Sequence, residues 1–410
     1  MDKERYILIA IITEDAKDTE ASLDELARLI DTAGGMECGR VTQKLAHPDT
    51  KTYFGSGKVE NLKQEISLRE ADGIVCDDEL TPVQIYSLSK ALGVKVIDRT
   101  VVILDIFAAH AKTREGKVQI EMAQLKYRVS HLSGIGVSLS RQGGGIGTRG
   151  PGETKLETDR RAIRHRIGQL ARQIHEMEAV RDTGRKRRIK SQAVVIAIVG
   201  YTNAGKSTLL NKLTGAGILA EDKLFATLDP TTRALTLPDG MQILMTDTVG
   251  FIHKLPHQLI EAFKSTLEEA AYADIILHVI DGSDAEFELR RKVVYDTLAQ
   301  LKITGKPIIT AFNKSDLGTG EILRDPSADR TVKISAKSGE GLSDLLAAIS
   351  GILKERQIYL QMLIPYSQAG FANKVRQQGQ IEKEEYTEEG IRITAFAPVS
   401  LVREYENISR

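Results

Sequence analysis

Residues 194–214 read VVIAIVGYTNAGKSTLLNKLT. The first six are a continuous apolar run, typical of a strand buried on both faces, and STLLNKLT at 207–214 has helical spacing. Between them, G-x4-G-K-S joins strand to helix, the context in which this pattern predicts a phosphate-binding loop. Its glycines let backbone N–H groups converge on a phosphate, while Lys206 would reach the β- and γ-phosphates and the Ser207 hydroxyl would bind Mg2+. The loop residues expected to contact the nucleotide are Gly200, Tyr201, Thr202, Asn203, Ala204, Gly205, Lys206, Ser207 and Thr208.

A second motif follows in QILMTDTVG at 242–250, which reads as a strand ending in D-x-x-G. Asp247, at the end of this strand, would contact Mg2+ through water. Gly250 would bring a backbone N–H to the γ-phosphate. Together with Lys206, it is one of the residues expected to act in catalysis. The motif contributes Asp247, Thr248, Val249 and Gly250 to the predicted site.

Two further motifs predict which base is bound. PIITAFNKSD at 307–316 is a strand ending in N-K-S-D. The Asp316 carboxylate would accept two hydrogen bonds, from N1–H and the 2-amino group of guanine, and adenine lacks that edge. Lys314 would lie along the base, and the backbone of SAK at 335–337 could reach the guanine O6. The predicted base contacts are Asn313, Lys314, Ser315, Asp316, Ser335, Ala336 and Lys337.

The four motifs occur in the order of the G1, G3, G4 and G5 elements of GTPases, each at a strand end, where open α/β sheets bind ligands. A switch I threonine should complete the Mg2+ shell, and FATLDPTTR at 225–233 supplies candidates. Its spacing from Lys206 and Asp247 favours Thr227, also as a catalytic residue, over Thr231 and Thr232. Those two could instead belong to the following strand. The nucleotide contacts predicted here are Phe225, Ala226, Thr227, Leu228 and Asp229.

Composition limits the class of protein. The 410 residues are 41% hydrophobic and 27% charged, ordinary values for a globular protein of several domains. The two cysteines, Cys38 and Cys76, have no metal-ligand spacing and predict neither a disulfide framework nor a zinc site. Apolar runs reach about eight residues, and a membrane helix needs about twenty. We therefore expect a cytoplasmic protein without membrane insertion, leaving peripheral membrane association open.

The order of patterns predicts four parts. Residues 1–111 alternate strands and helices and predict a parallel α/β domain. Residues 112–191 predict a helical hairpin with a linker at 183–191, residues 192–355 a P-loop G domain, and residues 356–410 a small α+β domain. FGSGK at 54–58 lacks the spacing of a phosphate loop, and a plain turn is favoured there.

The hairpin region contains a second glycine-rich stretch, RQGGGIGTRGPGETK at 141–155. Apolar residues spaced 4, 3, 4, 3 occur before it, from Val118 to Leu132, and after it, from Ile163 to Met177, which predicts an antiparallel coiled-coil pair. Between Lys112 and Lys190 there are 19 Lys and Arg against 8 Asp and Glu, a local +11 within a chain of net charge zero. This asymmetry favours RNA contact over a merely solvated surface. The residues expected to touch RNA are Arg141, Gly143, Gly144, Gly145, Gly147, Arg149 and Lys155.

GYTNAGKSTL, FATLDPTTR, DTVGFIHKLP and SGIGVSLSRQGGGIGTRGPGETKLETDRR together resemble the HflX GTPases over almost the whole chain. The resemblance implies binding to the 50S ribosomal subunit and its 23S rRNA, and splitting of stalled ribosomes, notably under heat stress. A GTPase acting in RNA processing or ribosome assembly is the alternative, and a non-enzymatic nucleotide binder is disfavoured. We expect a monomer that uses Mg2+ and GTP.

Hydrolysis raises a separate question, because Phe251 follows D-x-x-G where small GTPases commonly have a water-orienting Gln. A partner surface, a backbone group or a monovalent cation could complete the site. Asn203 is the candidate K+ ligand by analogy with related NAGKS loops, or it merely stabilises the loop. His253 and His257, in switch II (247–257), are disfavoured as water-orienting bases.

Overall fold

The computed structural model describes residues 3–13, 19–140, 151–191, 194–215, 224–225, 227–256, 269–318, 323–355, 357–398, 401 and 405. The chain forms two compact units. The first comprises Met1–Arg181, Glu221–Asp229 and Ile252–Ser265, and the second comprises Asp182–Ala220, Pro230–Phe251 and Thr266–Arg410. Among the described helices, none is long and apolar enough to cross a membrane.

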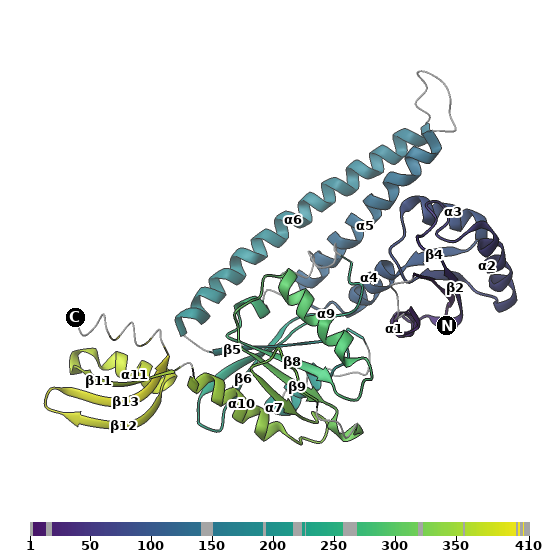
Figure 1. Cartoon of the computed structure of the whole chain (residues 1–410). Helices are drawn as coiled ribbons and strands as arrows, with labels where there is room; N and C mark the ends of the chain where they lie inside the picture. Colours follow the sequence, from purple (N-terminus) through teal and green to yellow (C-terminus); the bar gives the residue numbers. More distant parts are fainter. Residues whose placement is uncertain are drawn as a thin grey trace. The chain divides into compact units, whose positions relative to one another are not determined.

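The first unit begins with the predicted α/β domain. Its parallel four-stranded sheet has the order β2-β1-β3-β4. Helices cover both faces of this sheet (Figure 1), which is why the central strands β1 and β3 are nearly continuous apolar runs. The elements are β1 Arg5–Ile12, α1 Thr19–Thr32, β2 Met36–Lys44, α2 Ser56–Arg69, β3 Gly73–Cys76, α3 Pro82–Leu92, β4 Lys95–Asp98 and α4 Arg99–His110.

The FGSGK segment in this domain makes a turn into α2. Gly55 is the N-cap residue of that helix, and its N–H donates to Gln43 Oε1 at 3.0 Å. A side chain at Gly57 would meet nothing within 4 Å. The segment therefore has the local geometry of a helix start, as the sequence favoured.

The predicted hairpin consists of α5 Arg114–Ser140 and α6 Pro151–Ser191. The two helices run alongside each other in opposite directions (Figure 1), and Arg166 on α6 pairs with Glu121 on α5 at 2.8 Å. Along α6, Leu170 is fully buried while its neighbours on the outer face are exposed, as the apolar spacing predicts.

Two predicted boundaries of the hairpin are wrong. Residues 183–191 were expected to be a linker, but α6 continues to Ser191. Arg and Lys are good helix formers and the segment has no proline, so its single glycine does not end the helix. The glycine-rich stretch at 141–155 was expected to join the two helices, yet α6 already begins at Pro151. Residues 141–150 lie outside the described part of the chain.

The second unit contains the G domain. Its six-stranded sheet has the order β10-β9-β8-β5-β7-β6, and only β6 is antiparallel to its neighbour. Helices α7 and α10 pack on one face, where Leu209 and Ile349 join the core, and α9 lies on the other face (Figure 1). The elements are β5 Val194–Gly200, α7 Lys206–Thr214, β6 Thr231–Thr236, β7 Gln242–Asp247, β8 Ile275–Asp281, α9 Phe287–Gln300, β9 Ile308–Asn313, η1 Ser315–Leu317, β10 Arg330–Lys333 and α10 Leu342–Glu355.

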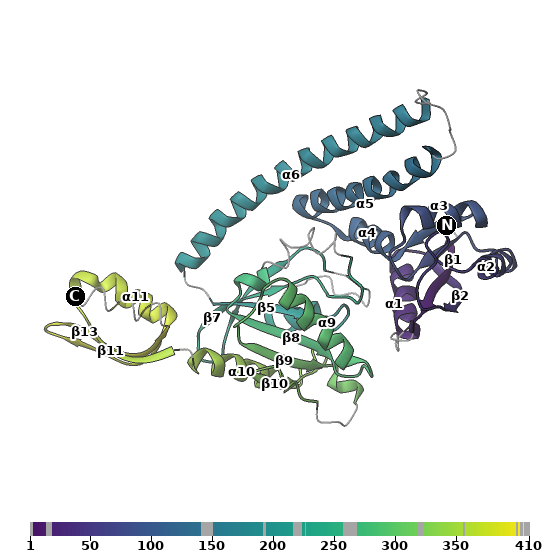
Figure 2. The same cartoon turned by 45° about the horizontal axis from the view of Figure 1, so that its top comes forward.

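The C-terminal part contains both strands and a helix, as the predicted small α+β domain requires, in the order β-α-β-β. Its antiparallel sheet has the order β11-β13-β12, and α11 covers one face of it (Figure 2). Phe371 and Val375 of the helix pack on Ile393 of the central strand. The elements are β11 Gln357–Ile364, η2 Tyr366–Gln368, α11 Ala369–Gln378, β12 Gln380–Thr387 and β13 Gly390–Pro398. The fold class predicted from the sequence is confirmed.

Candidate nucleotide and Mg2+ site

The loop from β5 to α7 contains two glycines, Gly200 and Gly205, at positions where a side chain does not fit. Gly200 has φ 158° and Gly205 has φ 94°, and a Cβ on either would collide. At Gly200 it would lie 2.2 Å from the carbonyl oxygen of Val279 on the neighbouring strand β8, and at Gly205 it would lie 2.2 Å from Nδ2 of Asn313. The loop backbone is therefore held close to two strand ends.

Lys206 starts helix α7 and is only 6% exposed. Its ammonium donates to the carbonyl oxygens of Gly200 and Tyr201, at 3.2 and 2.8 Å. Burial lowers the pKa of Lys206 to about 8, and the Asp247 carboxylate opposes this shift. A phosphate beside this partly desolvated cation would stabilise its charged form, because an opposite charge favours ionisation.

The predicted metal ligands Ser207 and Asp247 are in contact. The Ser207 hydroxyl donates to Asp247 Oδ2 at 2.7 Å, and Asp247 is fully buried at the end of β7. A hydroxyl and a carboxylate beside each other supply the hard oxygen donors that Mg2+ prefers. Among the residues that the structure describes, no group of three His, Cys, Asp or Glu could hold a metal alone.

The D-x-x-G segment is tied to the phosphate loop by backbone hydrogen bonds. Phe251 N–H donates to the Gly200 carbonyl at 3.1 Å, and Thr202 N–H donates to the Phe251 carbonyl at 2.8 Å. A Cβ on Gly250 would lie 2.8 Å from Thr202 Cα and 3.0 Å from Lys206 Nζ, so only glycine fits. Phe251 is 2% exposed, which places its ring inside the protein.

Asn313 connects three of the predicted motifs. Its Nδ2 donates to the Ala204 carbonyl of the phosphate loop at 2.8 Å, and its Oδ1 accepts from Ala336 N–H at 2.8 Å. Sequence reasoning named Asn313 as a base contact, and the structure gives it this bridging position. The signal available in the sequence was its place at the end of a buried strand.

The carboxylate predicted to read guanine is held in place. The Ser335 hydroxyl donates to Asp316 Oδ1 at 2.7 Å, and this bond lowers the pKa of Asp316. Lys314 has φ 65°, and its ammonium lies 2.6 Å from Asp281 Oδ2. Sequence reasoning missed Asp281, although it ends β8 directly opposite Asn313 in the sheet register.

Not every residue predicted from the sequence lies at the edge of the G-domain sheet where these strands end. Thr227 belongs to the first unit, whereas Ser207 and Asp247 belong to the second, so its part in the Mg2+ shell stays a prediction. The alternatives Thr231 and Thr232 lie in strand β6. Ala226, His257 and residues 141–150 lie outside the described residues, and for Lys155 only the helical backbone is described. They include the predicted RNA contacts Arg141, Gly143, Gly144, Gly145, Gly147 and Arg149.

A doubly wound sheet that carries this phosphate loop, the contacting residues Ser207 and Asp247, and the Asp316 carboxylate defines the class of P-loop GTPases. Family models agree: "GTP-binding GTPase N-terminal" matches residues 20–108, "GTP-binding GTPase Middle Region" residues 110–188, and "50S ribosome-binding GTPase" residues 195–314. The GTPase HflX of Lacrimispora saccharolytica is 56% identical over 400 residues, 97% of this chain and 95% of that protein. The Escherichia coli GTPase HflX is 38% identical over 396 residues, which are 94% of this chain and 92% of that protein. The chain therefore belongs to the HflX GTPases, and it hydrolyses GTP.

Among solved structures, a GTP-binding protein from Sulfolobus solfataricus in complex with GDP is 24% identical, with a TM-score of 0.44. The alignment covers 85% of this chain and 98% of that one.

Proposed function

We propose that this GTPase binds the large ribosomal subunit through its 23S rRNA and splits stalled ribosomes, notably under heat stress. The observation that carries the proposal is that the closely packed phosphate loop and D-x-x-G segment occur in one chain with a helical hairpin of local charge +11. GTP would order the switch segments, and the ordered protein would dock the hairpin on rRNA. The active species is inferred to be a cytoplasmic monomer.

In this mechanism the nucleotide is held from three sides. The backbone of the phosphate loop and Lys206 neutralise the β- and γ-phosphates, and Asp316 selects guanine. Bound Mg2+ would neutralise developing charge on the phosphates, held by Ser207, by Thr227 and, through water, by Asp247. Gly250 N–H would sense the γ-phosphate and thereby set the position of switch II.

The water-orienting group is the open part of the catalytic site. The buried Phe251 ring has no hydrogen-bonding atom, so intrinsic hydrolysis should be slow. Asn203 has φ 60° in the middle of the phosphate loop, and we propose it as a K+ ligand there. Turnover measured in KCl and in NaCl tests this, because equal rates would remove K+ from the mechanism.

The hairpin is proposed as the RNA-binding element. Glycines at 143–147 would let the backbone approach RNA, and Arg141, Arg149 and Lys155 would meet phosphates. Binding should weaken steeply with salt. Replacing Gly143–Gly147 by alanine is expected to impair ribosome splitting and leave GTP binding intact. Loss of GTP binding in that variant would show that the two glycine-rich loops are assigned wrongly.

The experiment that tests the function compares GTP turnover alone and with purified 30S, 50S and 70S particles. Stimulation by 50S or 70S, with conversion of 70S to free subunits in a gradient, is the expected result. Co-sedimentation with 50S in the presence of a non-hydrolysable GTP analogue separates the alternative. A protein that fails to sediment with 50S but binds free RNA would act in RNA processing or ribosome assembly instead.

A further inference from the structure

Parts of both switch segments belong to the first unit of the chain. Residues 221–229 include the start of switch I (225–233), and residues 252–265 include the end of switch II. Both pieces belong to the same compact unit as the N-terminal domain and the hairpin, although they follow the phosphate loop in sequence. The contacts that hold them there are specific.

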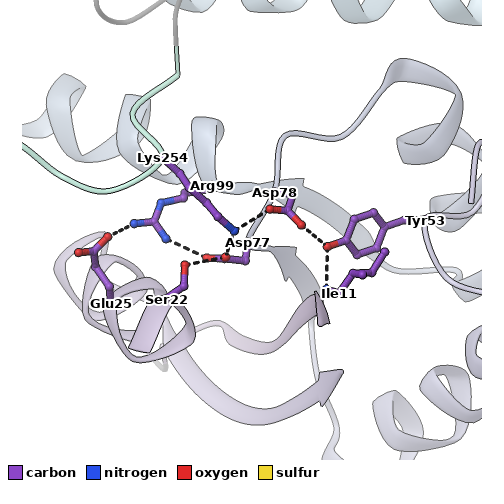
Figure 3. A network of polar contacts seen from close by, with 8 residues as sticks. All are labelled: Ile11, Ser22, Glu25, Tyr53, Asp77, Asp78, Arg99 and Lys254. Carbon is purple, nitrogen blue, oxygen red and sulfur yellow. Dashed lines mark hydrogen bonds and ion pairs between the residues drawn. The ribbon is translucent and has the colours of Figure 1, made fainter. Parts of the chain in front are cut away.

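Switch II is bound through Lys254 (Figure 3). Its ammonium lies 2.5 Å from Asp77 Oδ2 and 2.7 Å from Asp78 Oδ1, just after strand β3. Asp77 is 1% exposed. Burial by itself would lower the pKa of Lys254, but the two carboxylates outweigh it and the pKa is raised. The lysine therefore keeps its charge in this position.

Asp77 and Asp78 belong to a cluster of carboxylates and basic groups that also includes Glu25 and Arg99. Arg99 donates to Asp77 Oδ1 at 2.8 Å and also to Glu25 (Figure 3). Asp77 is the fully buried member of this cluster, and a buried carboxylate needs paired charge. Its Oδ1 pairs with Arg99 and its Oδ2 with Lys254. Ser22 donates to Asp77 and Tyr53 donates to Asp78, and these bonds fix the two carboxylates in place.

Switch I is held at two points. The Phe225 ring packs edge-on against Phe107 of α4, with centroids 4.6 Å apart. Asp229 Oδ2 accepts from the N–H groups of Lys112 and Thr113, at 3.0 and 2.9 Å, directly before α5 begins. The Thr113 hydroxyl also donates to Asp229 and accepts from the Gly116 N–H at 3.0 Å, which caps the helix.

The held conformations are strained. Phe225 has φ 58° and Lys254 has φ 52°, in the left-handed region that side chains other than Gly, Asn and Asp rarely adopt. Such residues persist where their surroundings hold them, and they concentrate in switch regions. The described part of each switch piece thus carries a strained residue, Phe225 or Lys254, which the N-terminal domain binds.

One continuous segment, residues 99–116, carries the partners of Phe225 and Asp229, and Lys254 is linked to its start through Asp77 and Arg99. It bears Arg99 and Phe107 on α4 and then leads into α5, the first helix of the hairpin. Asp98 caps α4 through Val101 N–H and accepts from the hydroxyl of Tyr127 on α5 at 3.0 Å. Helix α4 is therefore linked to α5 at both of its ends: through the Asp98–Tyr127 hydrogen bond at its start, and through the chain itself after its end.

We propose that residues 99–116 transmit the nucleotide state from both switch segments to the base of hairpin helix α5. Rearrangement of the switches around the γ-phosphate changes the contacts of Lys254, Phe225 and Asp229, and α5 responds. By reciprocity, a ligand bound to the hairpin changes the preference for GTP over GDP. The relevance of this coupling to RNA rests on the proposed function, but the coupling itself does not require RNA.

The test is hydrogen–deuterium exchange of the full chain, bound to GDP or to a non-hydrolysable GTP analogue without ribosomes. Residues 99–131 are expected to exchange differently in the two states. Lys254→Met removes one anchor and Phe225→Leu weakens another, and each should lose much of that difference. Asp78→Asn, which changes the partner of Lys254 in the N-terminal domain, should do the same. Lys302→Met is the matched control, because Lys302 is an exposed lysine with φ 58° in the second unit.

Two results would overturn the proposal: no nucleotide-dependent difference at 99–131 in the unchanged protein, or an undiminished difference in all three variants. GDP affinity is measured for each variant, so that lost nucleotide binding is not mistaken for lost coupling. Co-sedimentation with 50S is measured separately. A protein that shows the exchange difference but never binds 50S would retain the coupling and refute the proposed function.

Discussion

Polar residues lie at strand ends in both the G domain and the N-terminal domain. In the G domain, strands β7, β8 and β9 end in Asp247, Asp281 and Asn313. In the N-terminal domain, β4 ends in Asp98, and Asp77 directly follows β3. Both sheets are parallel at these strands, so the polar residues collect at equivalent edges. Their partners differ. Asn313 and Asp247 bind groups of the phosphate loop and helix α7, whereas Asp98 caps α4 and Asp77 is neutralised by Arg99 and Lys254.

This difference shows that a parallel sheet determines where polar strand-end residues lie, but not which groups they bind. In the G domain the strand-end residues Asn313 and Asp247 hold the phosphate loop and the start of α7. In the N-terminal domain the corresponding residues bind groups of the first unit itself. Substitutions at the first edge should therefore change ligand recognition, and substitutions at the second should change stability.

The largest effect is expected from Asp316→Asn. An amide cannot accept both guanine hydrogen bonds, but it can donate to the additional carbonyl of xanthine. The preference for GTP over XTP should fall by about 10,000-fold, the size of discrimination typical of a hydrogen-bonding site. Competition binding with the two nucleotides measures it. Asp344→Asn, on the exposed face of α10, is the control. An unchanged preference would remove Asp316 from base recognition.

At the other edge, Arg99→Met should destabilise the fold. Arg99 is 2% exposed, and its loss leaves buried carboxylates without their guanidinium. Breaking such a pair costs about 3–5 kcal/mol. Denaturant unfolding of the full chain measures the change. Arg330→Met breaks the exposed pair with Glu355 and should cost less than about 1 kcal/mol. Equal effects of the two variants would contradict the assigned role of the Arg99 cluster.

The two glycine-containing turns offer a matched pair of alanine substitutions. Gly205→Ala places a Cβ against Asn313 at φ 94° and should destabilise the G domain by about 2–3 kcal/mol, with weaker GDP binding. Gly57→Ala meets open space in α2 and should be neutral or stabilising by up to about 1 kcal/mol. Thermal unfolding and GDP titration of both variants test this. Similar losses in both would mean that the two turns are constrained alike.

The smallest effect concerns acid stability. His278 on β8 is 1% exposed, and burial lowers its pKa to about 4, so it is neutral in the folded protein. Between pH 6.5 and 4 the unfolded chain takes up this proton first, so stability falls as pH falls, by about 1–2 kcal/mol near pH 5. Burial raises the pKa of Asp98, so acid does not weaken the N-terminal domain through that group. Unfolding of His278→Gln between pH 5 and 7 should show a shallower pH dependence.

Apolar periodicity predicted the strands and helices well because it reports burial, and burial follows the layers of an α/β fold. It could not predict that α6 continues to Ser191, because the polar, basic segment has no apolar face to mark its end. The motifs placed Ser207 and Asp247 at the same edge of the sheet as separate Mg2+ contacts, and the structure adds the hydrogen bond between them. Asp281 and Lys254 were missed as partners, because their significance depends on residues far away in sequence.

Asp229 has a consequence for how the chain is made. Its carboxylate binds the backbone N–H groups of Lys112 and Thr113, which precede it by 117 and 116 residues. During synthesis the start of α5 therefore leaves the ribosome long before the carboxylate that binds the two residues preceding that helix. Until the G domain has been made, this end of the hairpin should fray. The base of the hairpin is thus among the last parts of the first unit to become rigid.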